Sequence, residues 1–95
     1  MTEAYLVREI ATALRKRGAV VYRTHGSMLT NPGVADLIVG YAGRYYELEV
    51  KLPGRYLSAV QNVRAMTVQL SGCQSAVVRS VEEAIAVIAG TKETP

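Results

Sequence analysis

The 95-residue chain lacks phenylalanine and tryptophan altogether and has one cysteine and one histidine. Cys73 therefore cannot form an internal disulfide, which agrees with a reducing compartment. We interpret it as a small buried side chain beside Gly72. His25 has no cysteine or histidine neighbour at metal-ligand spacing. Neither residue is assigned any chemistry.

Long apolar runs, repeats and linkers are also missing. Apolar residues make up 49% of the chain and are spread along its whole length, which fits neither a disordered chain nor a membrane protein. The opening segment, MTEAYLVREI, is polar and helix-like and lacks the apolar stretch of a secretory signal. We therefore expect a cytoplasmic protein that makes no membrane contact, with one domain spanning residues 1–95.

Charge is limited to a net +3, but its distribution is uneven. Of eight acids, two lie at Glu47 and Glu49, and Asp36 stands alone in an apolar run. A basic surface around an acidic spot suits a polyanionic ligand bound through a metal. By itself this is a weak indication, because many proteins with such a charge bind no nucleic acid.

Apolar periodicity predicts three helices and four strands. Leu6, Ile10, Ala13 and Leu14 form one face of a helix over Glu3–Arg17, and a second helix from Ser58 has Val60, Val63, Met66 and Leu70 on one side. The remaining predicted elements are strands in AVVYRT, VADLIVGY, RYYELEVKL and SAVVR and a helix in SVEEAIAVIAG. Strands two and three form an antiparallel hairpin around Ala42-Gly43. The order αβββαβα predicts an α/β sandwich whose last two strands are parallel neighbours.

Strand three alternates between a charged and an apolar side. Glu47, Glu49 and Lys51 share one face, and Leu48 and Val50 share the other. The ordinary interpretation of such a strand is a solvated outer face.

Asp36, on the preceding strand, favours a different interpretation. It could be a turn or cap residue, yet a hairpin closing at Ala42-Gly43 pairs it with Glu49. Two carboxylates at one end of a hairpin, with Lys51 beside them, repel each other unless a cation lies between them. Oxygen ligands of this kind suit Mg²⁺, which polarises phosphoryl groups and activates water. Lys51 would orient or deprotonate that water, or stabilise the phosphate.

Several segments together resemble a known nuclease family. Gly33-Val34-Ala35-Asp36, Glu49-Val50-Lys51, the Leu57–Gln61 segment LSAVQ and the segment VVRSVEEAI resemble the VRR-NUC branch of the PD-(D/E)XK nucleases. The resemblance covers nearly the whole chain. It implies a restriction-endonuclease-like αβββαβ core, with a mixed sheet flanked by helices and a C-terminal helix.

The resemblance also implies a site and a cofactor. The implied chemistry is DNA phosphodiester hydrolysis with Mg²⁺ or Mn²⁺ and no organic cofactor. Asp36 and Glu49 would be metal ligands, Lys51 the catalytic lysine and Gln61 a supporting residue. Glu9 is a secondary metal-ligand candidate, and a solvated glutamate is an equal alternative. Gln61 has an equal alternative too, as the third helical residue of a capping box opened by Ser58.

Stand-alone members of the family resemble Holliday-junction resolvases of phages and mobile elements. A structure-selective endonuclease acting on branched or four-way-junction DNA is therefore expected, as a homodimer that presents two sites to two strands. The family's proline before the metal-binding aspartate is Ala35 here, which affects rigidity more than chemistry. The alternatives are a catalytically inactive nucleic-acid-binding module of the same fold and a plain interaction domain.

Other polar and aromatic residues have ordinary interpretations. Glu47 is expected to be solvated or auxiliary. The cations Arg23, His25, Arg44, Arg55 and Arg64 are expected at the surface, with phosphate contact as the alternative, and Tyr22, Tyr41, Tyr45, Tyr46 and Tyr56 are expected mainly in the core. The loop over residues 26–33 could wrap DNA or a second subunit.

Overall fold

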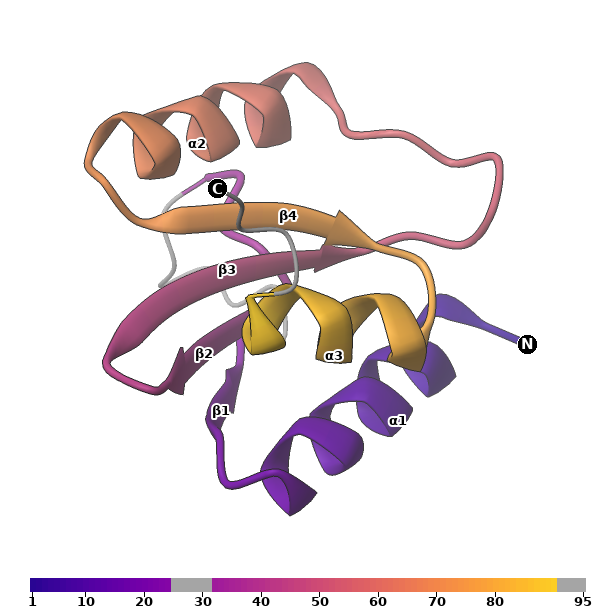
Figure 1. Cartoon of the computed structure of the whole chain (residues 1–95). Helices are drawn as coiled ribbons and strands as arrows, with labels where there is room; N and C mark the ends of the chain where they lie inside the picture. Colours follow the sequence, from indigo (N-terminus) through magenta and orange to yellow (C-terminus); the bar gives the residue numbers. More distant parts are fainter. Residues whose placement is uncertain (25–31, 91–95) are drawn as a thin grey trace.

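The computed structural model of the chain describes residues 1–24 and 32–90. Within them, four strands form one sheet in the order β1-β2-β3-β4. Helices α1 and α3 cover one face and α2 covers the other (Figure 1). The elements are α1 (Glu3–Lys16), β1 (Val20–Arg23), β2 (Leu37–Tyr41), β3 (Arg44–Val50), α2 (Ala59–Leu70), β4 (Gln74–Val78) and α3 (Val81–Ala89). The predicted order is confirmed.

The register of the hairpin between β2 and β3 decides where the acids lie. Its two-residue turn has positive φ at Ala42 (52°) and Gly43 (77°), and such a turn matches the right-handed twist of the paired strands. Leu37 pairs with Leu48 and Ile38 with Glu47 in antiparallel register, and Glu49 pairs with Val77 of β4 in parallel register. The predicted register of the antiparallel hairpin is confirmed. Strand β2 begins at Leu37, so Asp36 lies just before the strand.

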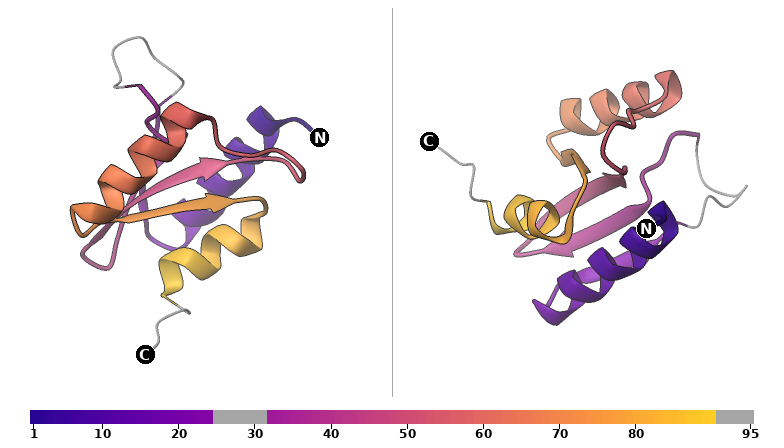
Figure 2. Two further views of the ribbon diagram at one scale, coloured as in Figure 1. Left: turned by 90° about the horizontal axis from the view of Figure 1, so that it is seen from above. Right: turned by 90° about the vertical axis from the view of Figure 1, so that its right-hand side faces the viewer.

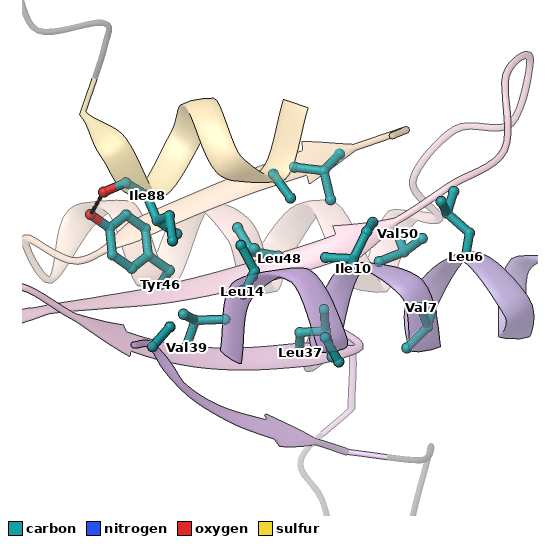
Figure 3. Packing of buried hydrophobic residues seen from close by; sticks show 14 residues of the cluster. Leu6, Val7, Ile10, Leu14, Leu37, Val39, Tyr46, Leu48, Val50 and Ile88 are labelled. Atoms are coloured by element: carbon teal, nitrogen blue, oxygen red, sulfur yellow. Dashed lines mark hydrogen bonds between the residues drawn. The ribbon is translucent and has the colours of Figure 1, made fainter. Parts of the chain in front are cut away.

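The apolar core lies between the sheet and the helix pair α1 and α3. The inward side of α1 contributes Leu6, Ile10 and Leu14, which pack against the apolar side of β3 (Figure 3). Tyr46 is buried there, and its hydroxyl donates to the Ile88 carbonyl at 3.3 Å. Figure 2 shows both helices on this side of the sheet, opposite α2. The other face of the sheet is therefore free for polar groups.

Helix α2 has its apolar side turned away from the sheet. Val60, Val63, Met66 and Leu70 are more than half exposed, whereas Val68 is buried. The helix itself is confirmed, and its capping box at Ser58 is complete. The apolar positions noted in the sequence therefore lie on the exposed side of the helix. Cys73, which follows the helix, is half-buried rather than buried. No helix within the described ranges is both long and apolar enough to cross a membrane.

Candidate metal centre

Asp36 is fixed at the open end of the hairpin by its neighbours. Its Oδ2 accepts a hydrogen bond from the Val50 backbone N–H at 2.9 Å. Thr24, buried at the end of β1, donates its N–H to the Asp36 carbonyl and its hydroxyl to the Ala35 carbonyl, each at 3.0 Å. The expected backbone-capping role of Asp36 is therefore real, and it turns the carboxylate toward the end of β3. The role of Thr24 depends on tertiary position alone, so no sequence pattern indicated it.

Glu49 is the neighbouring acid, and its side chain lies under α2 with only 8% of the residue exposed. Burial raises its pKa to about 8, assisted by the negative charge of Asp36 and a hydrogen bond with that carboxyl group. Lys51 opposes the rise, with Nζ 3.8 Å from Glu49 Oε2. A cation held between the two carboxylates would relieve this repulsion and favour the ionised form of both.

Lys51 is held beside the acids by its backbone. It follows the last residue of β3, and its N–H donates to the Val78 carbonyl at 3.1 Å. The side chain is largely covered, at 14% exposure. Its ammonium group therefore lies near Glu49 with few competing waters, where its interaction with a charged ligand is stronger than at an exposed position.

Gln61 makes contacts that fit both interpretations of its sequence position, as a capping-box residue and as a neighbour of the site. Its side-chain Oε1 accepts from the Ser58 N–H at 2.9 Å, which completes the capping box of α2. Its Nε2 donates to Glu49 Oε2 at 3.0 Å. One amide thus joins the start of α2 to the site.

Glu47, on the same strand, is buried rather than solvated. It is 1% exposed, so the solvated interpretation is wrong. Arg64 of α2 forms two hydrogen bonds with its carboxylate, one from Nε at 3.0 Å, and the Tyr45 hydroxyl donates at 2.6 Å. Although burial opposes it, these bonds and one from the Ala35 backbone lower the pKa of Glu47. Glu47 is therefore an ionised anchor for α2.

The backbone of Ala35 also contributes to the surroundings of Glu47. The Ala35 backbone hydrogen bond that helps to lower the pKa of Glu47 comes from its N–H, because only a donor stabilises a carboxylate. Proline has no N–H. Alanine in place of proline at this position therefore leaves a backbone N–H that donates to the buried Glu47, which the sequence alone could not reveal.

Helix α1 presents a different acid from the one the sequence favoured. Glu9 is exposed, whereas Glu3, in the first turn of α1, is partly buried. The charge of Glu3 contributes to the raised pKa of Glu49, so Glu3 lies within electrostatic reach of the site. Glu3 precedes the first apolar residue of the helical stripe, so the pattern of α1 did not indicate it.

The other expected cations and aromatics divide between surface and interior. Arg44 and Arg55 are exposed as predicted, and Arg64 is tied to Glu47. The expected core position is correct for Tyr46 and wrong for Tyr22 and Tyr56, which are 61% and 77% exposed. His25 and most of the loop over residues 26–33 lie outside the described residues.

The donor set fits a hard divalent cation with open positions. Asp36 and Glu49 offer carboxylate oxygens, and Mg²⁺ commonly takes one or two such ligands with water and substrate phosphate. In the part of the chain that the structure describes, no three His, Cys, Asp or Glu side chains gather in a metal-binding cluster. A cavity of about 210 Å³ lies between α2 and the sheet, and its lining includes Gly33, Glu47, Glu49 and Gln61.

The fold has counterparts among solved structures. The chain is similar to a solved VRR_NUC domain, with a TM-score of 0.74 and 22% identity over 94% of this chain and 97% of that one. It is also similar to Hjc, a Holliday junction resolvase of the hyperthermophilic archaeon Archaeoglobus fulgidus, with a TM-score of 0.59 and 27% identity over 75% of this chain and 61% of that one. No family model matches the sequence, and no curated protein matches it. The fold expected from the VRR-NUC resemblance is confirmed.

Proposed function

We propose that the chain is a metal-dependent DNA endonuclease, formed by one domain over residues 1–95. The observation that carries the proposal is the meeting of Asp36, Glu49 and Lys51 at one end of the β2–β3 hairpin, where Lys51 Nζ lies 3.8 Å from Glu49. The similarity to a nuclease domain and a resolvase supports the same conclusion. DNA inside the cell is the expected substrate.

Each residue has a role that follows from its position. Asp36 and Glu49 would hold Mg²⁺ or Mn²⁺, which when bound polarises a phosphoryl group and lowers the pKa of water. Lys51 would donate hydrogen bonds to the scissile phosphate or orient the attacking water. Gln61 holds the Glu49 carboxylate in place through Nε2. Glu3, rather than the exposed Glu9, is the acid of α1 that we include at the periphery of the site.

We further propose branched DNA, with the four-way junction preferred, as the substrate. Support comes from the fold shared with the archaeal protein, whose described activity is Holliday junction resolution. A chain with one site cuts two strands most simply as a homodimer. Origin in a phage or prophage stays a prediction from the sequence resemblance.

The test is a gel assay with labelled linear, flap and four-way-junction DNA in Mg²⁺, Mn²⁺ or EDTA. The wild type should cut only with a divalent ion and fastest on the junction. Lys51→Ala should lose about a hundredfold or more in cutting rate while keeping its fold and DNA binding. Retained cutting by Lys51→Ala would refute the assignment. Salt-sensitive binding without any product from the wild type would favour the inactive binding module instead.

A further inference from the structure

The segment that joins β3 to α2 begins with a fixed turn beside the proposed site. A hydrogen bond from the Arg55 N–H to the Leu52 carbonyl at 3.1 Å closes this turn. Pro53 is its second residue, and Gly54, with φ of 84°, is its third. Proline followed by a glycine with positive φ is the pattern of a type II turn. Because the turn comes directly after Lys51, its shape determines where the following residues lie.

Arg79, the residue after β4, holds the turn against the end of that strand. Its Nη1 donates to the Leu52 carbonyl at 3.0 Å and to the Arg55 carbonyl at 2.7 Å. The Arg79 backbone is fixed as well, because its N–H donates to the Glu83 carboxylate at 2.8 Å. A segment restrained in this way has little freedom left to lose on binding, so the side chain that it presents is preorganised.

Tyr56 is the side chain that this segment presents. Arg79 Cζ lies 5.5 Å from the centroid of the Tyr56 ring, which is a cation–π contact on one face. The residue is 77% exposed, so most of the ring is in water. Tyr46, in contrast, has its ring in the core and its hydroxyl bonded to a backbone carbonyl. An exposed aromatic ring that is held in place can stack against a second flat ring.

The charges around Tyr56 indicate what kind of ring fits. The segment KLPGRYL over residues 51–57 has two cations and no acid. Within residues 1–24 and 32–90, neither Arg55 nor Arg79 forms an ion pair with a carboxylate. A nucleobase arrives with phosphate groups beside it, which these cations attract. An uncharged aromatic ligand would leave the cations without a partner.

We infer that Tyr56 is a stacking platform for an unpaired DNA base and that the Arg79 guanidinium supports the ring from behind. The choice of DNA rests on the proposed function. Inside a duplex both faces of a base are covered by its neighbours, so only a base at a flap, a branch point or a strand end offers a free face. The platform therefore strengthens binding to branched DNA relative to a linear duplex.

The position of Tyr56 in the chain limits where on the DNA that base lies. Tyr56 is five residues after Lys51 and five before Gln61. Five residues span at most about 18 Å, and successive nucleotides of one strand are about 3.4 Å apart along a duplex. The stacked base therefore lies within roughly five nucleotides of the phosphate that Lys51 would contact. Figure 1 shows the segment between β3 and α2 projecting beyond the end of β3.

Photocrosslinking to flap DNA in EDTA, which withholds the divalent ion, tests the platform without cutting. The flap carries 5-iodouracil at its unpaired positions, because this base forms adducts on irradiation preferentially with an aromatic ring stacked on it. Mass spectrometry of the digested protein should locate the adduct at Tyr56 in the wild type. Tyr56→Phe should give an adduct at the same position, and Tyr56→Ala should give none there.

Affinities measured in the same buffer separate base stacking from phosphate contact. Tyr56→Ala should weaken binding to the flap about tenfold and leave binding to a linear duplex unchanged. Tyr56→Phe should bind both as the wild type does. Tyr22→Ala is the matched control, since Tyr22 is 61% exposed on β1, and it should change neither affinity. Circular dichroism should show the same fold in every variant, because both tyrosines are exposed.

Four results would overturn the inference: a wild type that binds no DNA, an adduct elsewhere and none at Tyr56, an unchanged flap affinity in Tyr56→Ala, or an equal loss on flap and duplex. Cutting is measured separately in Mg²⁺. A protein that stacks the flap base on Tyr56 and cuts nothing would retain this inference and refute the nuclease. Metal-dependent cutting without any contribution from Tyr56 would do the reverse.

Discussion

Glu47 and Glu49 are two residues apart on one face of β3 and have opposite ionisation behaviour. Both are buried, which by itself would raise the pKa of each. Glu47 accepts hydrogen bonds from Arg64 and Tyr45, and these lower its pKa despite burial. Burial and the hydrogen bond to Glu47 raise the pKa of Tyr45 to about 12, whereas Arg64 opposes that rise. Burial raises the pKa of Glu49 to about 8, and the negative charge of Asp36 adds to the rise while Lys51 opposes it. The difference between the pKa values of Glu47 and Glu49 therefore comes from their neighbouring side chains rather than from burial, which both share.

The raised pKa of Glu49 predicts a pH-dependent stability of the metal-free protein. Between about 4.5 and about 8 the folded protein keeps a proton on Glu49 that the unfolded chain loses. Stability from this group is therefore complete below that window and decreases as the pH rises through it. Urea unfolding in EDTA should show a midpoint that falls across this range, and Glu49→Gln should fall less steeply. Parallel slopes for the two proteins would contradict the assigned pKa.

Helix α2 shows what a periodic pattern predicts and what it leaves open. The spacing of Val60, Val63 and Leu70 predicted the helix, and Ser58 predicted its start. The pattern left open which side of the helix faces the sheet, because apolar periodicity carries no information about the buried carboxylates on β3. Hydrogen bonds to buried acids outweigh the burial of a few aliphatic side chains, since an unpaired buried carboxylate costs more.

The double role of Gln61 can be separated by substitution. Gln61→Glu keeps an acceptor for the Ser58 N–H, so the capping box survives. It loses the amide donor to Glu49 and places a second acid beside it. Cleavage should fall about tenfold or more, while the free energy of unfolding changes by less than about 1 kcal/mol.

Ser58→Ala is the matched control for this prediction. It removes the hydroxyl that accepts from the Gln61 N–H and should cost about 1 kcal/mol of stability, with cleavage largely retained. Single-turnover cleavage and urea unfolding measure the two effects separately. Wild-type cleavage by Gln61→Glu would show that Gln61 serves the helix alone.

The amount that the sequence could predict differs between fold and site. Period-two and helical patterns predicted all seven elements, and the turn at Ala42-Gly43 predicted the register that brings Asp36 to Glu49. These are local signals. Thr24, Glu3 and the Arg64 bridge to Glu47 depend on segments that meet only after folding, so no spacing indicated them. The family resemblance indicated Glu9 as a secondary candidate, with a solvated glutamate as an equal alternative, and the structure favours the alternative because Glu9 is exposed.

At the scale of the whole molecule, the two faces of the sheet differ in what they bury. Helices α1 and α3 enclose the apolar core on one face (Figures 1 and 3). Helix α2 covers Glu47 and Glu49 on the other. Substitutions at the site therefore leave the main core intact. This separation lets a small chain bury mutually repelling carboxylates, because the apolar burial that stabilises the fold lies elsewhere.

Asp36 and Glu49 should together bind a divalent cation, and calorimetric titration of the metal-free protein with Mn²⁺ measures that binding. We expect saturable binding by the wild type, weakened about tenfold or more by Asp36→Asn or by Glu49→Gln. Glu9→Gln, at an exposed position on α1, should bind as the wild type does. Absence of binding by the wild type, or equal binding by all four proteins, would rule out this cation site.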